Sequence, residues 1–304
     1  MTTKEQVRVE LERAGGGFLS GTQLAQQLGV SRNAVWKAVQ TLQKEGVPMQ
    51  AVSNRGYAIP PAKAGLSAPG IYGHLADPKR YFLHVHDTVT STNTLLRELA
   101  QQDAPEGTVV LANAQTAGRG RCGRVFYSPC RSGIYMSLLL RPKLPVEETL
   151  FITAAAAVSV ADAIDAAAGV RTRIKWVNDI YLQERKVCGI LTEAGTDLES
   201  GQLEWLVVGI GLNLTATAED FPPELAAKAG SLYPGGPAPV SRAALAGAIG
   251  RELLALCPGF ACLDEYRARC FVPGHWVTVC TGSETYAAQA LSIDDAGRLV
   301  VQRE

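Results

Sequence analysis

The N-terminal part of the chain carries short amphipathic patterns of helical spacing. Val7 and Leu11 lie four positions apart within residues 4–13, and apolar side chains at that spacing share one face of a helix. Residues 22–28 repeat the pattern and end at Gly29, a residue type that commonly stops helices. Two consecutive short helices are therefore predicted here.

A third helix is predicted to follow Ser31, a good N-cap, and to end at Glu45. Its apolar stripe consists of Val35, Val39 and Leu42. Two helices joined by a short glycine-containing turn form a helix-turn-helix. We therefore expect a helix-turn-helix at the start of the chain.

A hairpin is predicted after Gly46, with the segments VPMQAV and YAI as strands and SNRG as the turn. Such a hairpin forms a wing, and Arg55 at its tip is placed to enter a minor groove or to touch phosphate. Side chains that can donate to base edges and phosphates lie near the start of the third helix: Arg32, Asn33, Lys37 and Gln40. A three-helix interaction module that does not bind DNA is the alternative.

Charge is unevenly distributed along the chain. The 304 residues have a formal net charge of zero, but residues 1–62 contain seven Lys or Arg against four Glu. This region therefore carries +3 and the remainder −3. A basic head on an acidic body suits a head that meets a polyanion such as DNA.

From Tyr81 onward, short apolar runs alternate with helical patterns. The predicted strands are, in order, YFLHVHD, TVVLANAQ, GIYMSLLLRP, IKWVNDIYL, KVCGILTEAG and LEWLVVGIGLNL. Helices are predicted at residues 91–99, 150–170, 247–256 and 261–270. Short turns join most successive strands, so the sheet should be largely antiparallel and the fold class α+β. The final segment from His275 alternates in short runs with glycine turns and predicts a small barrel-like β module.

The segment PPAKAGLSAP, residues 60–69, has no apolar period and predicts a linker. The resulting division of the chain is a winged helix-turn-helix domain at 1–62, a linker at 63–79, a central domain at 80–270 and a C-terminal β domain at 271–304.

Composition excludes several classes of protein. The chain is 47% hydrophobic and 19% charged, which is ordinary for a globular protein. The apolar segment 150–170 is mostly alanine and holds Asp162 and Asp165, so a buried helix fits better than a membrane span. The N-terminus lacks the apolar core of a signal peptide. Seven cysteines without a C-x-x-C pair indicate reduced thiols and a cytoplasmic protein.

The most informative loop spans residues 113–131. Three glycines alternate there with three arginines, namely Gly118, Gly120 and Gly123 with Arg119, Arg121 and Arg124. Glycine permits close backbone approach, and arginine supplies forked donors for carboxylate and phosphate. The spacing is not that of a Walker loop. On residue types alone, an anion-binding loop, a nucleic-acid patch and a solvated loop all stay open.

A second cluster is the run KWVND, residues 175–179, which we place within a strand. The next strand begins at Lys186, so a hairpin should bring Lys186 close to Asp179. A lone pair of this kind usually lies on the surface and contributes little. The apolar flanks here favour a partly buried pair.

Together these motifs resemble the bifunctional biotin protein ligase and biotin operon repressor family over nearly the full length of the chain. The matching segments are STN at 91–93, QTAGRGRCGR at 115–124, KWVND at 175–179, KVCGIL at 186–191 and GIGLN at 209–213, with SRNAVWK in the helix-turn-helix. The resemblance implies a central ligase domain like class II aminoacyl-tRNA synthetases and an SH3-like C-terminal β-barrel.

The resemblance also implies roles for individual residues. Ser91, Thr92 and Gln115 would bind the ureido ring of biotin and its surroundings, and Arg119 with the Gly118 backbone would close over it. The full implied biotin set is Ser91, Thr92, Asn93, Gln115, Gly118, Arg119, Arg121, Lys186 and Gly189. The implied ATP and adenylate set is Arg121, Arg124, Lys175, Asn178 and Asn213.

The implied catalytic residues are Lys186, Arg121 and Asp179. Lys186 would stabilise the biotin carboxylate and the charge that develops on the mixed anhydride. Asp179 would place Mg²⁺ or the incoming amine. Joining a carboxylate to a triphosphate requires cations that offset the repulsion between two anions, and the arginine loop with Mg²⁺ provides them.

The implied activity uses ATP to form biotinyl-5′-AMP and transfers biotin to a lysine of the biotin carboxyl carrier protein domain of acetyl-CoA carboxylase. The implied further partners are operator DNA and a second copy of the chain, which joins when ligand binds. No membrane partner is expected. Three alternatives stay open: a lipoate ligase, a ligand-sensing repressor with little or no transfer activity, and a ligase whose head no longer binds DNA.

Overall fold

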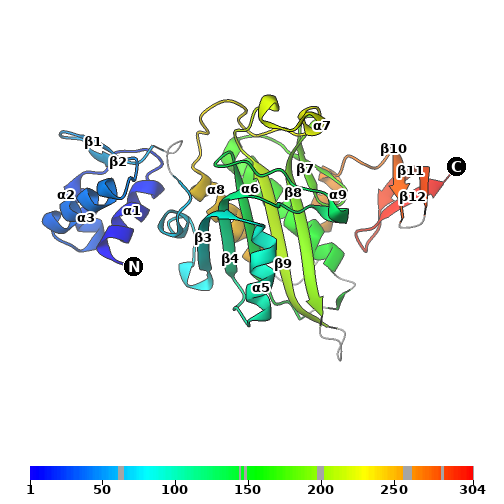
Figure 1. The fold of residues 1–304 in the computed structure, drawn as a ribbon, viewed down its shortest axis with the longest axis horizontal. Coiled ribbons are helices and arrows are strands. Elements are labelled where there is room, and N and C mark those ends of the chain that lie inside the picture. Colours follow the sequence, from blue (N-terminus) through cyan, green and yellow to red (C-terminus); the bar gives the residue numbers. More distant parts are fainter. Residues whose placement is uncertain are drawn as a thin grey trace.

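The computed structural model describes residues 1–60, 65–143, 145–146, 149–196, 202–255, 262–281 and 284–303. Figure 1 shows a helical unit at the N-terminal end, a large central sheet with helices, and a small sheet at the C-terminal end. The α+β class predicted from the sequence is confirmed, with a helix-turn-helix before the main sheet and a small antiparallel sheet after it.

The N-terminal unit has the predicted order of elements: α1 Thr3–Arg13, α2 Gly21–Leu28, α3 Arg32–Lys44, β1 Gln50–Val52 and β2 Gly56–Ala58. Ser31 caps α3, because its side chain accepts a hydrogen bond from Ala34 N at 3.1 Å. The residues of the predicted stripes are buried together in one core: Val7, Leu11, Leu24, Ala25, Val35, Val39 and Leu42. The two strands pair antiparallel as the predicted wing.

Seven strands form the central sheet in the order β3-β4-β5-β9-β8-β7-β6. They are β3 Phe82–Val89, β4 Thr108–Gln115, β5 Gly133–Leu140, β6 Arg173–Lys175, β7 Asp179–Leu182, β8 Arg185–Thr196 and β9 Leu203–Asn213. All neighbours pair antiparallel except β3 and β4, which are parallel and are connected through helix α5, Thr92–Gln101. The predicted, largely antiparallel sheet is therefore confirmed.

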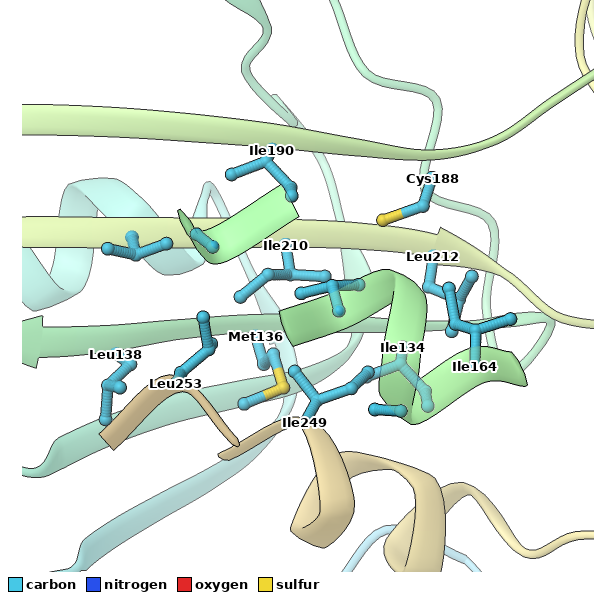
Figure 2. Packing of buried hydrophobic residues seen from close by; sticks show 14 of the residues in the cluster. Ile134, Met136, Leu138, Ile164, Cys188, Ile190, Ile210, Leu212, Ile249 and Leu253 are labelled. Atoms are coloured by element: carbon cyan, nitrogen blue, oxygen red, sulfur yellow. The ribbon is translucent and has the colours of Figure 1, made fainter. Parts of the chain in front are cut away.

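Helices cover both faces of this sheet. One face packs against α6 Thr149–Ala168, α8 Arg242–Leu254 and α9 Leu263–Arg269, and alternate strand residues such as Ile134, Met136 and Leu138 point into that core (Figure 2). The other face packs against α5 through a smaller cluster that includes Leu96 and Val207. Helix α6 is long and apolar enough to cross a membrane, but half of the apolar window is buried and the helix belongs to the core, as predicted.

The run KWVND corrects one expectation, because it is a turn and not a continuous strand. Strand β6 ends at Lys175, and β7 begins at Asp179 and folds back antiparallel on it. Asn178 holds this turn against β8: its Nδ2 donates to Ile190 O at 2.5 Å, and its own carbonyl accepts from Ile190 N at 2.9 Å. A side chain that takes over hydrogen bonds of the ladder allows the strand to break at this point.

The predicted linker also differs from expectation, because part of it is ordered structure. It contains helix α4, Ala68–Tyr72, and a short 3-10 helix at Pro78–Arg80, whereas residues 61–64 lie outside the described residues. Arg13 of α1 donates to Gly73 O at 2.9 Å, and a Cβ at Gly247 of α8 would lie 2.8 Å from His74 Cβ. The segment after α4 therefore packs between the helical head and the central domain.

The remaining elements complete the chain. Helix α8 begins at Arg242, five residues before the predicted start, because Ser241 caps it. Helix α9 matches its prediction to within two residues at the start, and the predicted boundaries Leu256 and Ala261 lie outside the described residues. A short helix α7, Pro223–Ala226, and 3-10 helices at Arg121–Gly123 and Ala218–Asp220 lie in loops. Strands β10 Trp276–Cys280, β11 Thr285–Ile293 and β12 Leu299–Arg303 form the C-terminal antiparallel sheet.

Candidate functional site

Polar side chains at the start of α5 meet the end of β4. Ser91, Thr92 and Asn93 are all buried. The backbone N and the Oγ1 of Thr92 donate to Gln115 Oε1 at 2.8 and 3.1 Å, and Gln115 Nε2 donates to Ser128 Oγ at 2.8 Å. These bonds fix which way the Gln115 amide points. The sequence predicted most of this group, and the structure brings it together.

Asn93 lies at the centre of the same network. Its Nδ2 donates to Glu193 Oε2 at 2.9 Å and to Leu191 O at 3.2 Å. Ser137 Oγ lies 2.6 Å from Asn93 Oδ1 and 2.8 Å from Thr92 Oγ1. Position 209 must be glycine here, because the Asn93 amide fills the space that a Cβ at Gly209 would need. Sequence patterns alone did not single out Ser137 or Glu193.

The glycine-arginine loop forms a small hairpin over this face of the sheet. Phe126 N donates to Gly118 O at 2.9 Å, and Gly120 N donates to Arg124 O at 2.7 Å. The loop brings the Phe126 ring over Gly211, where a Cβ would collide with the ring. Gly189 pairs directly with Gly211 across β8 and β9, and a Cβ there would lie 3.4 Å from the same ring. Two glycines thus make a flat floor under Phe126, a residue that the motifs did not identify.

The three arginines of the loop have different surroundings. Arg119 Nη1 lies 2.8 Å from Glu193 Oε1 in a salt bridge. Arg121 Nη1 donates to Asn178 Oδ1 at 3.4 Å, which connects the loop to the turn between β6 and β7. Arg124 is exposed, as is Lys175. The sequence grouped all of them as cations that offset the charges of a carboxylate and a triphosphate, and the structure pairs Arg119 with a carboxylate of the protein.

Lys186 and Asp179 form the pair that the hairpin predicted. Lys186 Nζ lies 2.6 Å from Asp179 Oδ1, and the two side chains are 32% and 24% exposed. The pair is therefore half-buried, as expected from its apolar flanks. Lys186 also borders the glycine floor, since a Cβ at Gly189 would lie 3.1 Å from its Nζ.

The segment after β9 packs beside Lys186. Lys186 N donates to Lys228 O and Gly230 N donates to Lys186 O, both at 2.9 Å. Asn213 is buried and its Nδ2 donates to Gly230 O at 3.0 Å. Asn213 thus lies in the same neighbourhood as Lys186, and in this structure its amide holds the segment in place.

Cys188 is a buried thiol on β8, near Lys186 and Asp179. Burial raises the pKa of the Cys188 thiol far above its ordinary value, so it stays protonated. Among the described residues, no group of three or more His, Cys, Asp or Glu could hold a metal ion. Mg²⁺ with a nucleotide needs only one or two carboxylates besides the phosphates, and Asp179 fits that requirement as a single carboxylate.

The candidate DNA-binding residues lie on a separate surface. Arg32, Asn33 and Lys37 are exposed on α3, whereas Gln40 is half-buried and its Nε2 donates to Gln43 Oε1 at 3.3 Å. Arg55 in the wing stacks over the Phe18 ring, 4.4 Å from its centroid. Trp36 of α3 is 52% exposed beside Lys37. An aromatic side chain on the polar face of this helix is the sequence signal that could have identified Trp36 as a further candidate for DNA contact.

Comparison with known proteins shows similarity in both halves of the chain. Residues 85–213 match the model of the biotin/lipoate A/B protein ligase family, and residues 3–58 match a helix-turn-helix domain. A biotin protein ligase variant from Aquifex aeolicus, solved in complex with biotin, is similar in structure with a TM-score of 0.61 and 25% identity. The similarity covers 73% of this chain and 91% of that one.

Curated relatives extend the similarity over nearly the whole chain. A protein named bifunctional ligase/repressor BirA from Bacillus spizizenii is 37% identical over 96% of this chain and 91% of its own length. A biotin–[acetyl-CoA-carboxylase] ligase from Mycobacterium tuberculosis is 34% identical over 69% of this chain and 79% of its own. With the helix-turn-helix head and the ligase-type sheet both present, the chain belongs to the family of bifunctional biotin protein ligases and biotin operon repressors.

Proposed function

We propose that this protein uses ATP to join biotin to a lysine of a carrier protein and also represses transcription as a DNA-binding protein. One observation carries the proposal. The buried polar network at the start of α5, the arginine loop and the Lys186–Asp179 pair all lie around the glycine floor of Gly189 and Gly211, in a chain that also has a winged helix-turn-helix. The proposed domains are 1–62, 80–270 and 271–304, with 63–79 between the first two.

Biotin fits the polar network and the floor by its chemistry. Its ureido group has one carbonyl acceptor and two N–H donors, which match the hydroxyls of Ser91 and Thr92 and the Gln115 amide. Gly189 and Gly211 make room for the Phe126 ring, and in this proposal the flat ring system of biotin packs beside that ring. In this proposal Asn93 and the Gly118 backbone complete the pocket.

The first reaction joins the biotin carboxylate to the α-phosphorus of ATP, and pyrophosphate leaves. Both reactants are anions, so the rate depends on cations that are already in place. Lys186 reaches the carboxylate from beside the glycine floor, and Arg121 and Arg124 hold phosphate groups. Lys175, Asn178 and Asn213 would border the nucleotide. Mg²⁺ on the triphosphate would supply further neutralisation, with Asp179 as its protein carboxylate.

The second reaction transfers biotin to the carrier. A lysine amine attacks the carbonyl carbon of biotinyl-5′-AMP, and AMP leaves. The amine must lose a proton, and Asp179 is the carboxylate in position to orient it or accept that proton once Lys186 turns to the phosphate. The expected acceptor is the biotin carboxyl carrier protein domain of acetyl-CoA carboxylase.

DNA binding would use Arg32, Asn33, Lys37 and Gln40 of α3, with Arg55 of the wing. We propose that bound biotinyl-5′-AMP favours a homodimer, because a two-fold dimer matches a palindromic operator. Sedimentation with and without the adenylate tests this, and an unchanged mass would contradict it. The partners and the six free cysteines among the described residues suit a cytoplasmic protein.

The decisive experiment incubates the protein with ATP, Mg²⁺, biotin and a carrier domain and measures the carrier mass. A gain of one biotin on one lysine supports the proposal. Biotinyl-5′-AMP without transfer would point to a different acceptor. If neither product forms, the result favours the alternative of a ligand-sensing repressor. A parallel reaction with lipoate distinguishes a biotin ligase from a lipoate ligase.

A further inference from the structure

Glu193 contacts both α5 and the glycine-arginine loop, although none of the sequence motifs includes it. Its Oε1 lies 2.8 Å from Arg119 Nη1 and 3.7 Å from Arg97 Nη1, and its Oε2 accepts from Asn93 Nδ2 at 2.9 Å. The carboxylate is 17% exposed. Donors from α5 and from the arginine loop thus converge on one half-buried carboxylate.

The position of Glu193 in β8 explains this convergence. Residues alternate along a strand, and Thr192 points to α6, where its Oγ1 meets Thr153 Oγ1 at 2.9 Å. Glu193 therefore faces the opposite side, with Asn93 of α5. It pairs with Val207 of β9, which belongs to the cluster packed under α5. The carboxylate thus lies on the α5 face of the sheet, in contact with both α5 and the glycine-arginine loop.

We propose that Glu193 is a positioning residue that closes the glycine-arginine loop over the biotin pocket by holding Arg119, and that aligns the pocket by holding Asn93. This inference rests on the proposed function, because the pocket is the biotin site of that proposal. Glu193 itself does not touch biotin or the nucleotide. It acts through Arg119 on the loop and through Asn93 on Ser137 and Thr92.

This role implies that the three arginines of the loop have different functions. The charge of Arg119 is offset by Glu193, so Arg119 serves to anchor the loop. The Arg121 guanidinium donates to the neutral amide of Asn178, and Arg124 is exposed. Their charges stay available for phosphate. Loss of Glu193 should therefore weaken biotin binding without removing the cations that the reaction needs.

The test is Glu193→Gln, which keeps the size of the side chain and an acceptor for Asn93 but removes the charge that holds Arg119. The matched control is Glu204→Gln, which removes one charge from an exposed position on the neighbouring strand β9. Three properties are measured for each variant: KM and kcat of biotinyl-5′-AMP formation with respect to biotin, and the rate at which trypsin cuts after Arg121 and Arg124 in the ligand-free protein.

For Glu193→Gln we expect KM for biotin to rise about tenfold, as for the loss of one charge-assisted interaction. At saturating biotin kcat should change by less than about threefold, because the reacting groups are intact. Trypsin should cut the loop several times faster, whereas cutting elsewhere should not change. Glu204→Gln should match wild type in all three properties.

A wild-type KM and a wild-type cutting rate in Glu193→Gln would overturn the proposal. A fall in kcat with unchanged KM would also overturn it, because Glu193 would then act in the reaction. Should Glu193→Gln not fold, Arg119→Gln breaks the same contact without touching Asn93, and an unchanged cutting rate after Arg121 and Arg124 would be the contradicting result. If wild type makes no biotinyl-5′-AMP, the proposed function fails, yet the cutting rates still test the role of Glu193.

Discussion

The two functional surfaces of this protein differ in how exposed their side chains are and in how those side chains are bonded. On α3 the candidate DNA-binding side chains Arg32, Asn33 and Lys37 point into solvent, and the core that supports them lies on the other side of the helix. At the start of α5 the candidate side chains are buried and bonded to their neighbours, as Thr92 is to Gln115. The first surface should tolerate substitution without structural consequences. In the second, each substitution should disturb the side chains that are bonded to the replaced residue.

The largest effect should come from Lys186→Met. Removing the cation beside the glycine floor should slow biotinyl-5′-AMP formation about 100-fold or more, the scale of one preorganised charge in a reaction centre. Pyrophosphate release measures the rate, and Lys79→Met at an exposed position is the control. Operator binding measured without biotin and ATP should be the same in both variants and in wild type. Full synthesis by Lys186→Met would show that its proposed role is wrong.

The next effect concerns the exposed surface. The double variant Arg32→Ala/Lys37→Ala should lose at least about tenfold in operator affinity, because each contact to a base or phosphate contributes on the order of 1 kcal/mol or more. Gel-shift titration at several salt concentrations measures it, and the salt dependence should become shallower. Lys44→Ala, at the far end of α3, is the control. The melting temperature and the ligase rate should not change. An unchanged operator affinity would contradict the assignment of α3 as the helix that contacts DNA.

A substitution that adds one methyl group should show that the buried site, unlike the exposed surface of α3, is sensitive to a small change. Gly211→Ala places a Cβ in the space of the Phe126 ring, so the ring and its loop must move. We expect biotin affinity to fall about tenfold, as measured by calorimetry. Gly236→Ala, where a Cβ would have no neighbour within 4 Å, should leave affinity unchanged. Equal affinities for the two variants would mean that the position of the Phe126 ring over Gly211 does not affect biotin binding.

The smallest effect lies where the two regions meet. Burial raises the pKa of Glu12, which is 4% exposed and packs against Gly70 of α4. Because this pKa is raised in the folded state, stability is favoured while the carboxyl is protonated and falls as pH rises through that pKa. Glu12→Gln should therefore raise the melting temperature by about 2 °C near pH 7.5 and by less near pH 4.5. Calorimetry at both values checks this, with exposed Glu98→Gln as control. A lower melting temperature at pH 7.5 would show that the ion pair with Arg8 outweighs burial.

Sequence reasoning succeeded wherever the signal was local. The helices of the head, their cap at Ser31 and strands such as Thr108–Gln115 follow from periodicity and capping within a few residues. The contact of Asp179 with Lys186 also followed, because a hairpin joins strands that are close in sequence.

The failures have a common physical cause. Helix α4 has five residues with a proline and a glycine, so it lacks a periodic signal, and its packing between α1 and α8 stabilises it. The turn at residues 176–178 depends on Asn178 bonding to Ile190 in a different strand. Glu193 and Asn93 lie 100 positions apart, and no spacing rule connects them.

The sequence by itself determined the family, the order of the elements and most side chains of the candidate site, because motifs and amphipathic periods are short-range properties. Only the tertiary structure decided which side chains meet when their segments lie far apart in the chain. It paired Arg119 with Glu193, laid Phe126 over Gly211 and packed the segment around α4 between head and sheet. Such contacts form between segments far apart in the chain, and their free energy comes from burial and charge pairing in the folded state.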